Sequence, residues 1–112
     1  MSAPRKRSLA LGVVAVALAL PACGADVAAG AKKANEVCAA CHGPDGNKPI
    51  APDYPKLGGQ YRDYLQKTLK DYKSGARTNP IMTGQAQALT NKEIEDLAAY
   101  YASRPSTLVT KR

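Results

Sequence analysis

The stretch Cys38-Ala39-Ala40-Cys41-His42, "CAACH", decides how the rest of this sequence is interpreted. C-x-x-C-H is the pattern by which a c-type haem is attached to protein. Two cysteines one helical turn apart can each add a sulfur to a vinyl group of the porphyrin, and the next residue then reaches the iron from the same side. The pattern predicts that Cys38 and Cys41 attach one haem c covalently and that His42 is the proximal ligand of its iron.

Two other kinds of site use a C-x-x-C pair. A thioredoxin-like redox pair belongs in a βαβ unit, and no segment of this sequence alternates long enough to be a confident strand. A structural zinc site needs four protein ligands, whereas only two cysteines and one histidine are certain to remain after residue 25. Haem attachment is therefore the favoured interpretation.

Residues 1–25 have the pattern of a bacterial-type secretory signal. Basic residues at 5–7 precede an apolar run over 9–20, and small residues surround Ala25. A membrane span needs about 20 apolar residues, so the run favours cleavage near Ala25 over an anchor and predicts export to the periplasm. The "LPAC" before Cys23 leaves two alternatives, a lipoprotein signal that would tie the protein to a membrane or a retained free thiol.

Composition sets further limits on partners and on the core. Three of the 16 basic side chains lie in the predicted signal, so residues 26–112 have 13 basic and 9 acidic side chains and a net charge of +4. That charge favours an acidic partner and is too modest to indicate nucleic acid. The chain has no Trp or Phe. A small domain with few bulky apolar side chains in its core needs a further stabilising element, such as a bound prosthetic group.

Helical periodicity and end signals predict three main helices joined by two long loops. Asp26 can cap the first helix, Gly75 can end the second, and the Thr90-Asn91-Lys92-Glu93 capping box begins the third. Pro and Gly residues between 43 and 60 exclude a long helix there. The predicted helices cover residues 27–41, 61–74 and 91–103.

Met82 lies in the second predicted loop, within "TNPIMTG", and is the only methionine besides the initiator. His42 is the only histidine, so one chain cannot supply two histidines to the iron. The two certain cysteines are committed to attachment, and a tyrosine ligand would suit catalase-type chemistry. These counts favour Met82 as the distal iron ligand over the alternative that it fills a gap beside Ile81.

Taken together, the haem motif, "YPKLGGQY", "NPIM" and a final helix "IEDLAAYYAS" resemble the small bacterial monohaem class I cytochromes c. The sequence is also similar to single halves of their dihaem relatives and to haem subunits of periplasmic dehydrogenases. The resemblance covers residues 26–103. It implies an all-α class I cytochrome c fold over 26–112, with three main helices and long loops wrapped around one covalently bound haem.

The resemblance also implies roles for single residues. Cys38 and Cys41 would attach the haem, with His42 and Met82 as the iron ligands. A proline carbonyl would accept the other N–H of the proximal histidine, with Pro52 as the first choice and Pro55 as the second. Where the first and last helices cross closely, Gly30 would face Tyr100 or Tyr101.

An iron with two protein axial ligands has no open position for a small-molecule substrate. The sequence therefore predicts a periplasmic one-electron carrier and not an enzyme, with the haem-bearing subunit of a dehydrogenase complex as the alternative. Its expected partners are redox proteins with acidic docking surfaces. Lys48 and Lys56 are candidates for the docking surface.

Overall fold

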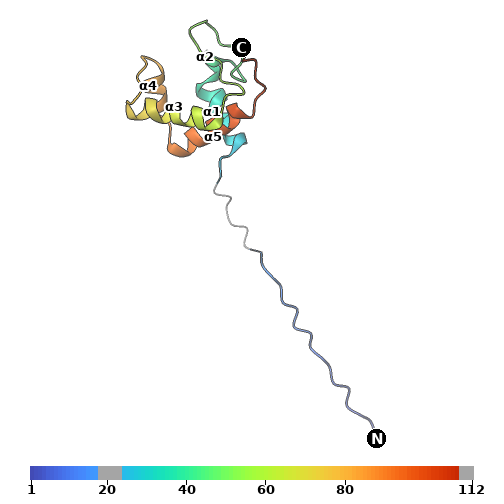
Figure 1. The fold of residues 1–112 in the computed structure, drawn as a ribbon. Coiled ribbons are helices and arrows are strands. Elements are labelled where there is room, and N and C mark those ends of the chain that lie inside the picture. The colour runs from blue at the N-terminus through green and yellow to red at the C-terminus, as the bar shows by residue number, and fades with distance from the viewer. Residues whose placement is uncertain (18–23, 109–112) are drawn as a thin grey trace.

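The computed structural model describes residues 1–17 and 24–108, and Figure 1 shows these ranges as one cluster of helices with an N-terminal extension. Within them the chain forms five α-helices and no strand, so the all-α prediction is confirmed. The three main helices are accompanied by two short ones that were not predicted separately. The helices are α1 (Val27–Val37), α2 (Ala39–His42), α3 (Arg62–Ser74), α4 (Met82–Gln87) and α5 (Asn91–Ala102).

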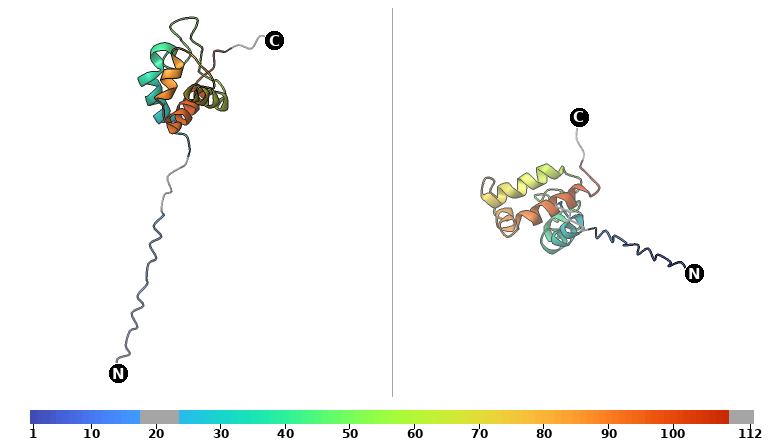
Figure 2. Two further views of the ribbon diagram at one scale, coloured as in Figure 1. Left: turned by 90° about the vertical axis from the view of Figure 1, so that its left-hand side faces the viewer. Right: turned by 90° about the horizontal axis from the view of Figure 1, so that it is seen from below.

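The N-terminal segment stands apart from the helices. Residues 1–17 have no helix or strand, their side chains are exposed, and Figure 2 shows them extending away from the folded part. The end of the predicted apolar run and Cys23 lie outside the described residues. In the parts of the chain that the structure describes, no helix has the length and apolar character needed to span a membrane.

Helix α1 begins where the sequence predicted. The Asp26 carboxylate accepts a hydrogen bond from the Ala29 backbone N–H at 3.1 Å and caps the helix. The predicted continuous helix divides at Cys38, which ends α1 and begins α2. Gly43, with φ of 86°, then ends α2 in a conformation that suits glycine.

The other two main helices also have the predicted ends. Gly75 ends α3 in the left-handed conformation, with φ of 85°. At the start of α5, the Glu93 N–H donates to the Thr90 hydroxyl at 3.1 Å, and the Thr90 N–H donates to the Glu93 carboxylate at 2.8 Å. The predicted capping box is therefore confirmed.

The core lies where α5 packs against α1 on one side and α3 on the other. At Gly30, a β-carbon would lie 2.1 Å from the Asp96 carbonyl oxygen and 2.9 Å from the Tyr100 β-carbon. The predicted close crossing is confirmed, with Tyr100 and not Tyr101 opposite the glycine. The buried cluster consists of Ala34, Leu65, Leu89, Ile94, Leu97, Ala98, Tyr100 and Tyr101.

A buried carboxylate fastens the start of α1 to the middle of α5. Asp96, 5% exposed, accepts hydrogen bonds from the Asp26 backbone N–H at 2.7 Å and from the Lys92 ammonium group. Burial works to raise the pKa of the Asp96 carboxyl, but these two donors outweigh burial and hold the pKa below its usual value. The carboxylate therefore stabilises the fold in its charged form.

Replacing Gly30 by alanine should force α1 and α5 apart. We expect Gly30→Ala to lower the free energy of unfolding by about 1–3 kcal/mol, because the added methyl meets backbone that cannot move aside. Denaturant unfolding of the haem-containing protein measures the loss. Asn35→Ala, at an exposed position of the same helix, is the control and should be neutral within about 0.5 kcal/mol. Equal stability of wild type and Gly30→Ala would contradict the close contact.

The contribution of Asp96 to the free energy of unfolding should depend on pH. We expect Asp96→Asn to lower the free energy of unfolding by about 1–3 kcal/mol near pH 7. Because the folded pKa is lowered, the difference from wild type should be complete above the unfolded pKa of about 3.9 and should shrink as the pH falls through the folded value. Unfolding curves at several pH values test this. The control is Glu95→Gln on the same helix, and a pH-independent difference would contradict the prediction.

Candidate haem site

The junction of α1 and α2 presents both cysteines of the motif within one turn. The backbone N–H groups of Cys41 and His42 both donate to the Cys38 carbonyl, at 3.2 and 3.0 Å. Both cysteines are free and partly buried. Burial raises the pKa of the Cys38 thiol, which disfavours the thiolate that a redox-active pair would need. Two thiols on one helical turn suit two thioether bonds to one flat ring.

His42 is held in a single orientation. Its side chain is buried, with Nδ1 2.8 Å from the Pro55 carbonyl oxygen and the Tyr54 ring edge-on at a centroid distance of 6.1 Å. Because a carbonyl only accepts hydrogen bonds, the proton is on Nδ1 and the lone pair is on Nε2. This is the arrangement of a histidine prepared to bind a metal.

The first choice of proline for this bond was wrong. Pro52 lies at the corner of a turn closed by the hydrogen bond from the Tyr54 N–H to the Ala51 carbonyl, at 3.1 Å. The chain approaches the His42 imidazole only after that turn, so the carbonyl of Pro55, the second choice, accepts the bond. Spacing alone did not show where the turn falls.

The loop between α2 and α3 is fixed by bonds to the C-terminal part of the chain. The Asn47 side chain donates to the Pro105 carbonyl at 2.7 Å and accepts from the Thr107 hydroxyl at 3.1 Å. The Tyr100 hydroxyl donates to the Pro44 carbonyl at 3.0 Å. Asn47 and Tyr54 could not be identified as site residues from the sequence, because their roles depend on partners that are distant in the chain.

Met82 begins a short helix and does not lie in an irregular loop, which corrects the prediction. Asn79 Oδ1 accepts the backbone N–H groups of Ile81 and Met82, both at 2.9 Å, and the Asn79 N–H donates to the Thr83 hydroxyl at 2.9 Å. An asparagine followed by proline is a helix-start signal, so the Asn79-Pro80 pair could have predicted α4. The Met82 side chain is partly buried.

Helix α4 belongs to the α3 side of the molecule. The two helices pack together, and the Lys73 ammonium group donates to the carbonyls of Gln87 and Leu89 at 3.2 and 2.5 Å. In the view of Figure 1, α2 and α4 are separate short helices that both lie above α3. The two predicted iron ligands therefore come from different elements.

The donor groups fit a covalently bound haem. Two thiols on one turn, a buried imidazole with its Nε2 lone pair available and a thioether on a separate helix are the set that a His/Met-ligated c-type haem requires. A zinc site would use the same cysteines but would need more Cys, His or carboxylate ligands. The fold and the donor set together define an all-α haem-binding domain.

Comparisons with known proteins agree with the assignment of an all-α haem-binding domain. The family model for cytochrome c matches residues 27–104. The chain is 52% identical over 82 residues to cytochrome c4 of Thiocapsa roseopersicina, covering 73% of this chain and 42% of that protein. It is 45% identical to cytochrome c-554(548) of Halomonas halodenitrificans, covering 70% of this chain and 96% of that protein. This chain belongs to the cytochrome c family, and the region that matches contains one C-x-x-C-H motif, Cys38–His42.

The structural comparison supports the same fold. The reduced recombinant cytochrome c4 from Pseudomonas stutzeri matches with a TM-score of 0.67 and 42% identity, covering 73% of this chain and 47% of that chain. The chain spans about half the length of the cytochromes c4 that it matches. The cofactor of the family is covalently bound haem c with its iron, and the Cys38–Cys41 pair is consistent with the attachment motif.

The turn before Met82 should depend on the Asn79 side chain. We expect Asn79→Ala to lower the free energy of unfolding by about 0.5–2 kcal/mol, because two backbone N–H groups lose their acceptor. Asn79→Asp keeps an acceptor and is the matched control, which should retain most of the stability. Denaturant unfolding measures both variants, and equal losses in the two would show that the side-chain oxygen is not what holds the turn.

Proposed function

We propose that this protein carries one electron at a time on a haem c attached through Cys38 and Cys41, with iron bound by His42 and Met82. The observation that supports this most directly is the 2.8 Å bond between His42 Nδ1 and the Pro55 carbonyl. It leaves one ring nitrogen for iron and fixes the plane of the imidazole. The neighbouring thiols are the attachment groups that the family requires.

The proposed ligands suit electron transfer and not catalysis. If His42 and Met82 both bind the iron, the protein would leave it no open position for a substrate. A methionine ligand favours the ferrous state and raises the reduction potential relative to nitrogen or thiolate ligands. The bound haem supplies the redox change, while the chain keeps both ligands in place and limits rearrangement as the charge changes.

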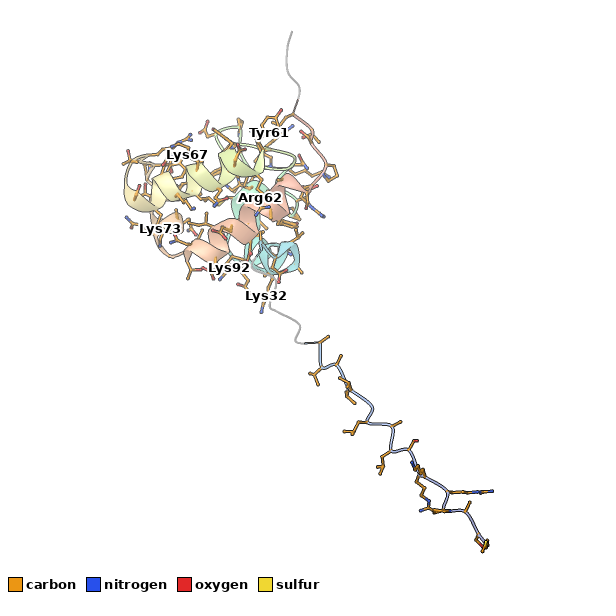
Figure 3. The ribbon with its side chains drawn as sticks, turned by 60° about the horizontal axis from the view of Figure 1, so that its bottom comes forward. Lys32, Tyr61, Arg62, Lys67, Lys73 and Lys92 are labelled. Carbon is orange, nitrogen blue, oxygen red and sulfur yellow. The ribbon has the colours of Figure 1, made fainter. Side chains whose placement is uncertain are left out.

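The charge distribution supports a redox protein partner with an acidic docking surface. Figure 3 labels basic side chains on α1, α3 and α5, and two of them, Lys67 and Lys92, are partly neutralised by Asp71 and Asp96. Lys48 and Lys56 are exposed in the loop after the haem motif, and neither forms an ion pair within the described residues. These two lysines are therefore better placed to attract an acidic partner to the loop that holds His42.

We further propose that residues 1–25 are a secretory signal and that residues 26–112 form the periplasmic cytochrome domain. The first hydrogen bonds of the folded part are made by Asp26, and residues 1–17 lie away from the helices. Lipid attachment at Cys23 would instead tie the protein to a membrane. Mass spectrometry of the protein recovered from periplasm distinguishes a cleaved chain from a lipid-modified one.

One measurement tests whether the haem is covalently attached, and another tests whether the protein acts as a free electron carrier. A reduced c-type haem spectrum that persists after acid-acetone extraction is expected, because the haem is bound through carbon–sulfur bonds; extraction of the haem would refute the attachment. Purification from the native periplasm then tests the free carrier. Stoichiometric co-elution with a large dehydrogenase subunit would favour the alternative, in which this chain is the electron-accepting subunit of that complex.

Removing the Met82 side chain should leave one coordination position of the iron available to an added ligand. We expect carbon monoxide to change the spectrum of reduced Met82→Ala rapidly and to leave the reduced wild type unchanged, because only the variant has a vacant sixth position. Ile81→Ala, at the exposed neighbouring position, is the matched control and should behave as wild type. Rapid binding of carbon monoxide by the wild type would refute stable ligation by Met82.

A further inference from the structure

The Tyr101 hydroxyl is an unusual group in this core. The residue lies on α5 and is only 3% exposed. Among buried side-chain nitrogen and oxygen atoms of the described residues, its hydroxyl is the one without a hydrogen-bonding partner. The preceding residue provides a contrast, because the Tyr100 hydroxyl donates to the Pro44 carbonyl at 3.0 Å.

The surroundings of Tyr101 hold its ring in place. A β-carbon on Gly46 would lie 2.9 Å from Tyr101 Cε1, so the loop backbone passes directly over the ring edge. The Gly59 N–H donates to the Tyr101 carbonyl at 2.9 Å and fastens the same loop to α5. The ring therefore cannot turn its hydroxyl to solvent without moving this loop.

The Tyr101 phenol neighbours the proposed haem attachment site. Cys38 packs against the buried cluster that contains Tyr101. Burial raises the pKa of the Tyr101 phenol, and the neighbouring Cys38 thiol raises it further. The phenol therefore remains protonated and available as a donor at neutral pH.

A buried hydroxyl without a partner destabilises the fold, and phenylalanine would fill the same space without that cost. Tyrosine is the better residue only if its hydroxyl gains a partner in the working protein. The group that Cys38 would carry beside this hydroxyl is the haem. The Tyr101 hydroxyl is therefore placed to donate a hydrogen bond at the thioether edge of that cofactor.

We propose that the Tyr101 hydroxyl donates a hydrogen bond at the Cys38 thioether edge of the bound haem and shifts the redox equilibrium toward the ferrous state. The inference rests on the proposed attachment at Cys38. An O–H group that donates toward the haem presents the positive end of its dipole. Reduction adds one negative charge to the iron centre, so this dipole stabilises the reduced form more than the oxidised form, and the low local polarity strengthens the effect. Tyr101 is thus a positioning and tuning residue that binds no iron.

The test compares Tyr101→Phe with Tyr100→Phe in the haem-containing protein. Each variant loses one hydroxyl from the same turn of α5, and the ring sizes are kept. We expect Tyr101→Phe to lower the equilibrium constant for reduction two- to fivefold, which is about 20–40 mV at 59 mV per tenfold for one electron. Tyr100→Phe should lower stability, because the Pro44 carbonyl loses its donor, and should leave the midpoint potential unchanged. Spectroelectrochemical titration measures the potential, and thermal unfolding measures stability.

Three results would overturn the inference. An unchanged midpoint potential in Tyr101→Phe, with raised stability, would show that the hydroxyl is simply unsatisfied. Equal shifts in both variants would show a general effect of loosening α5. Haem that acid-acetone extracts from the wild type would refute the attachment itself, a failure of the proposed function that the spectrum reveals before any potential is measured.

Discussion

The close approach of α1 and α5 at Gly30 is the constraint on which the rest of the structure depends. Without a β-carbon at this position, the backbone of one helix lies against the Asp96 carbonyl of the other. That contact brings the end of α1, with Cys38, against the end of α5, with Tyr101. The start of the haem motif is therefore placed by a contact two helical turns before it. The loop after the motif is then positioned by α5 as well, through Tyr100 and the residues that follow the helix.

The small aromatic content explains why polar bonds are so prominent in this core. With tyrosine as the only aromatic residue type besides histidine, each buried tyrosine ring brings a hydroxyl that needs a partner. Tyr100 uses its hydroxyl to hold the loop at Pro44. A buried carboxylate at Asp96 and a buried amide at Asn47 join other segments in the same way. Hydrogen bonds thus supply part of the specificity for one fold that bulky apolar side chains supply in larger cores.

Features that depend on neighbours in sequence were predictable, and features that depend on distant partners were not. The Asp26 cap, the Gly75 end and the Thr90–Glu93 capping box are local and were confirmed. The choice between Pro52 and Pro55 needed the position of a turn inside an irregular loop. The bonds of Asn47 needed the C-terminal segment. Helix α4 is a different case, because the Asn79-Pro80 pair just before it is a local signal for the start of a helix.

The separation of α4 from α2 has a consequence for the order in which parts of the structure unfold. His42 ends α2, which contacts α1, whereas Met82 begins α4, which packs against α3 and is joined to it by the Lys73 bonds. Opening of a short, partly exposed helix costs less free energy than opening of the main core. The segment that carries Met82 can therefore open while the segment that carries His42 stays folded. If Met82 binds the haem iron as proposed, that bond would join two cooperative units, and its rupture would be a sub-global event that precedes complete unfolding.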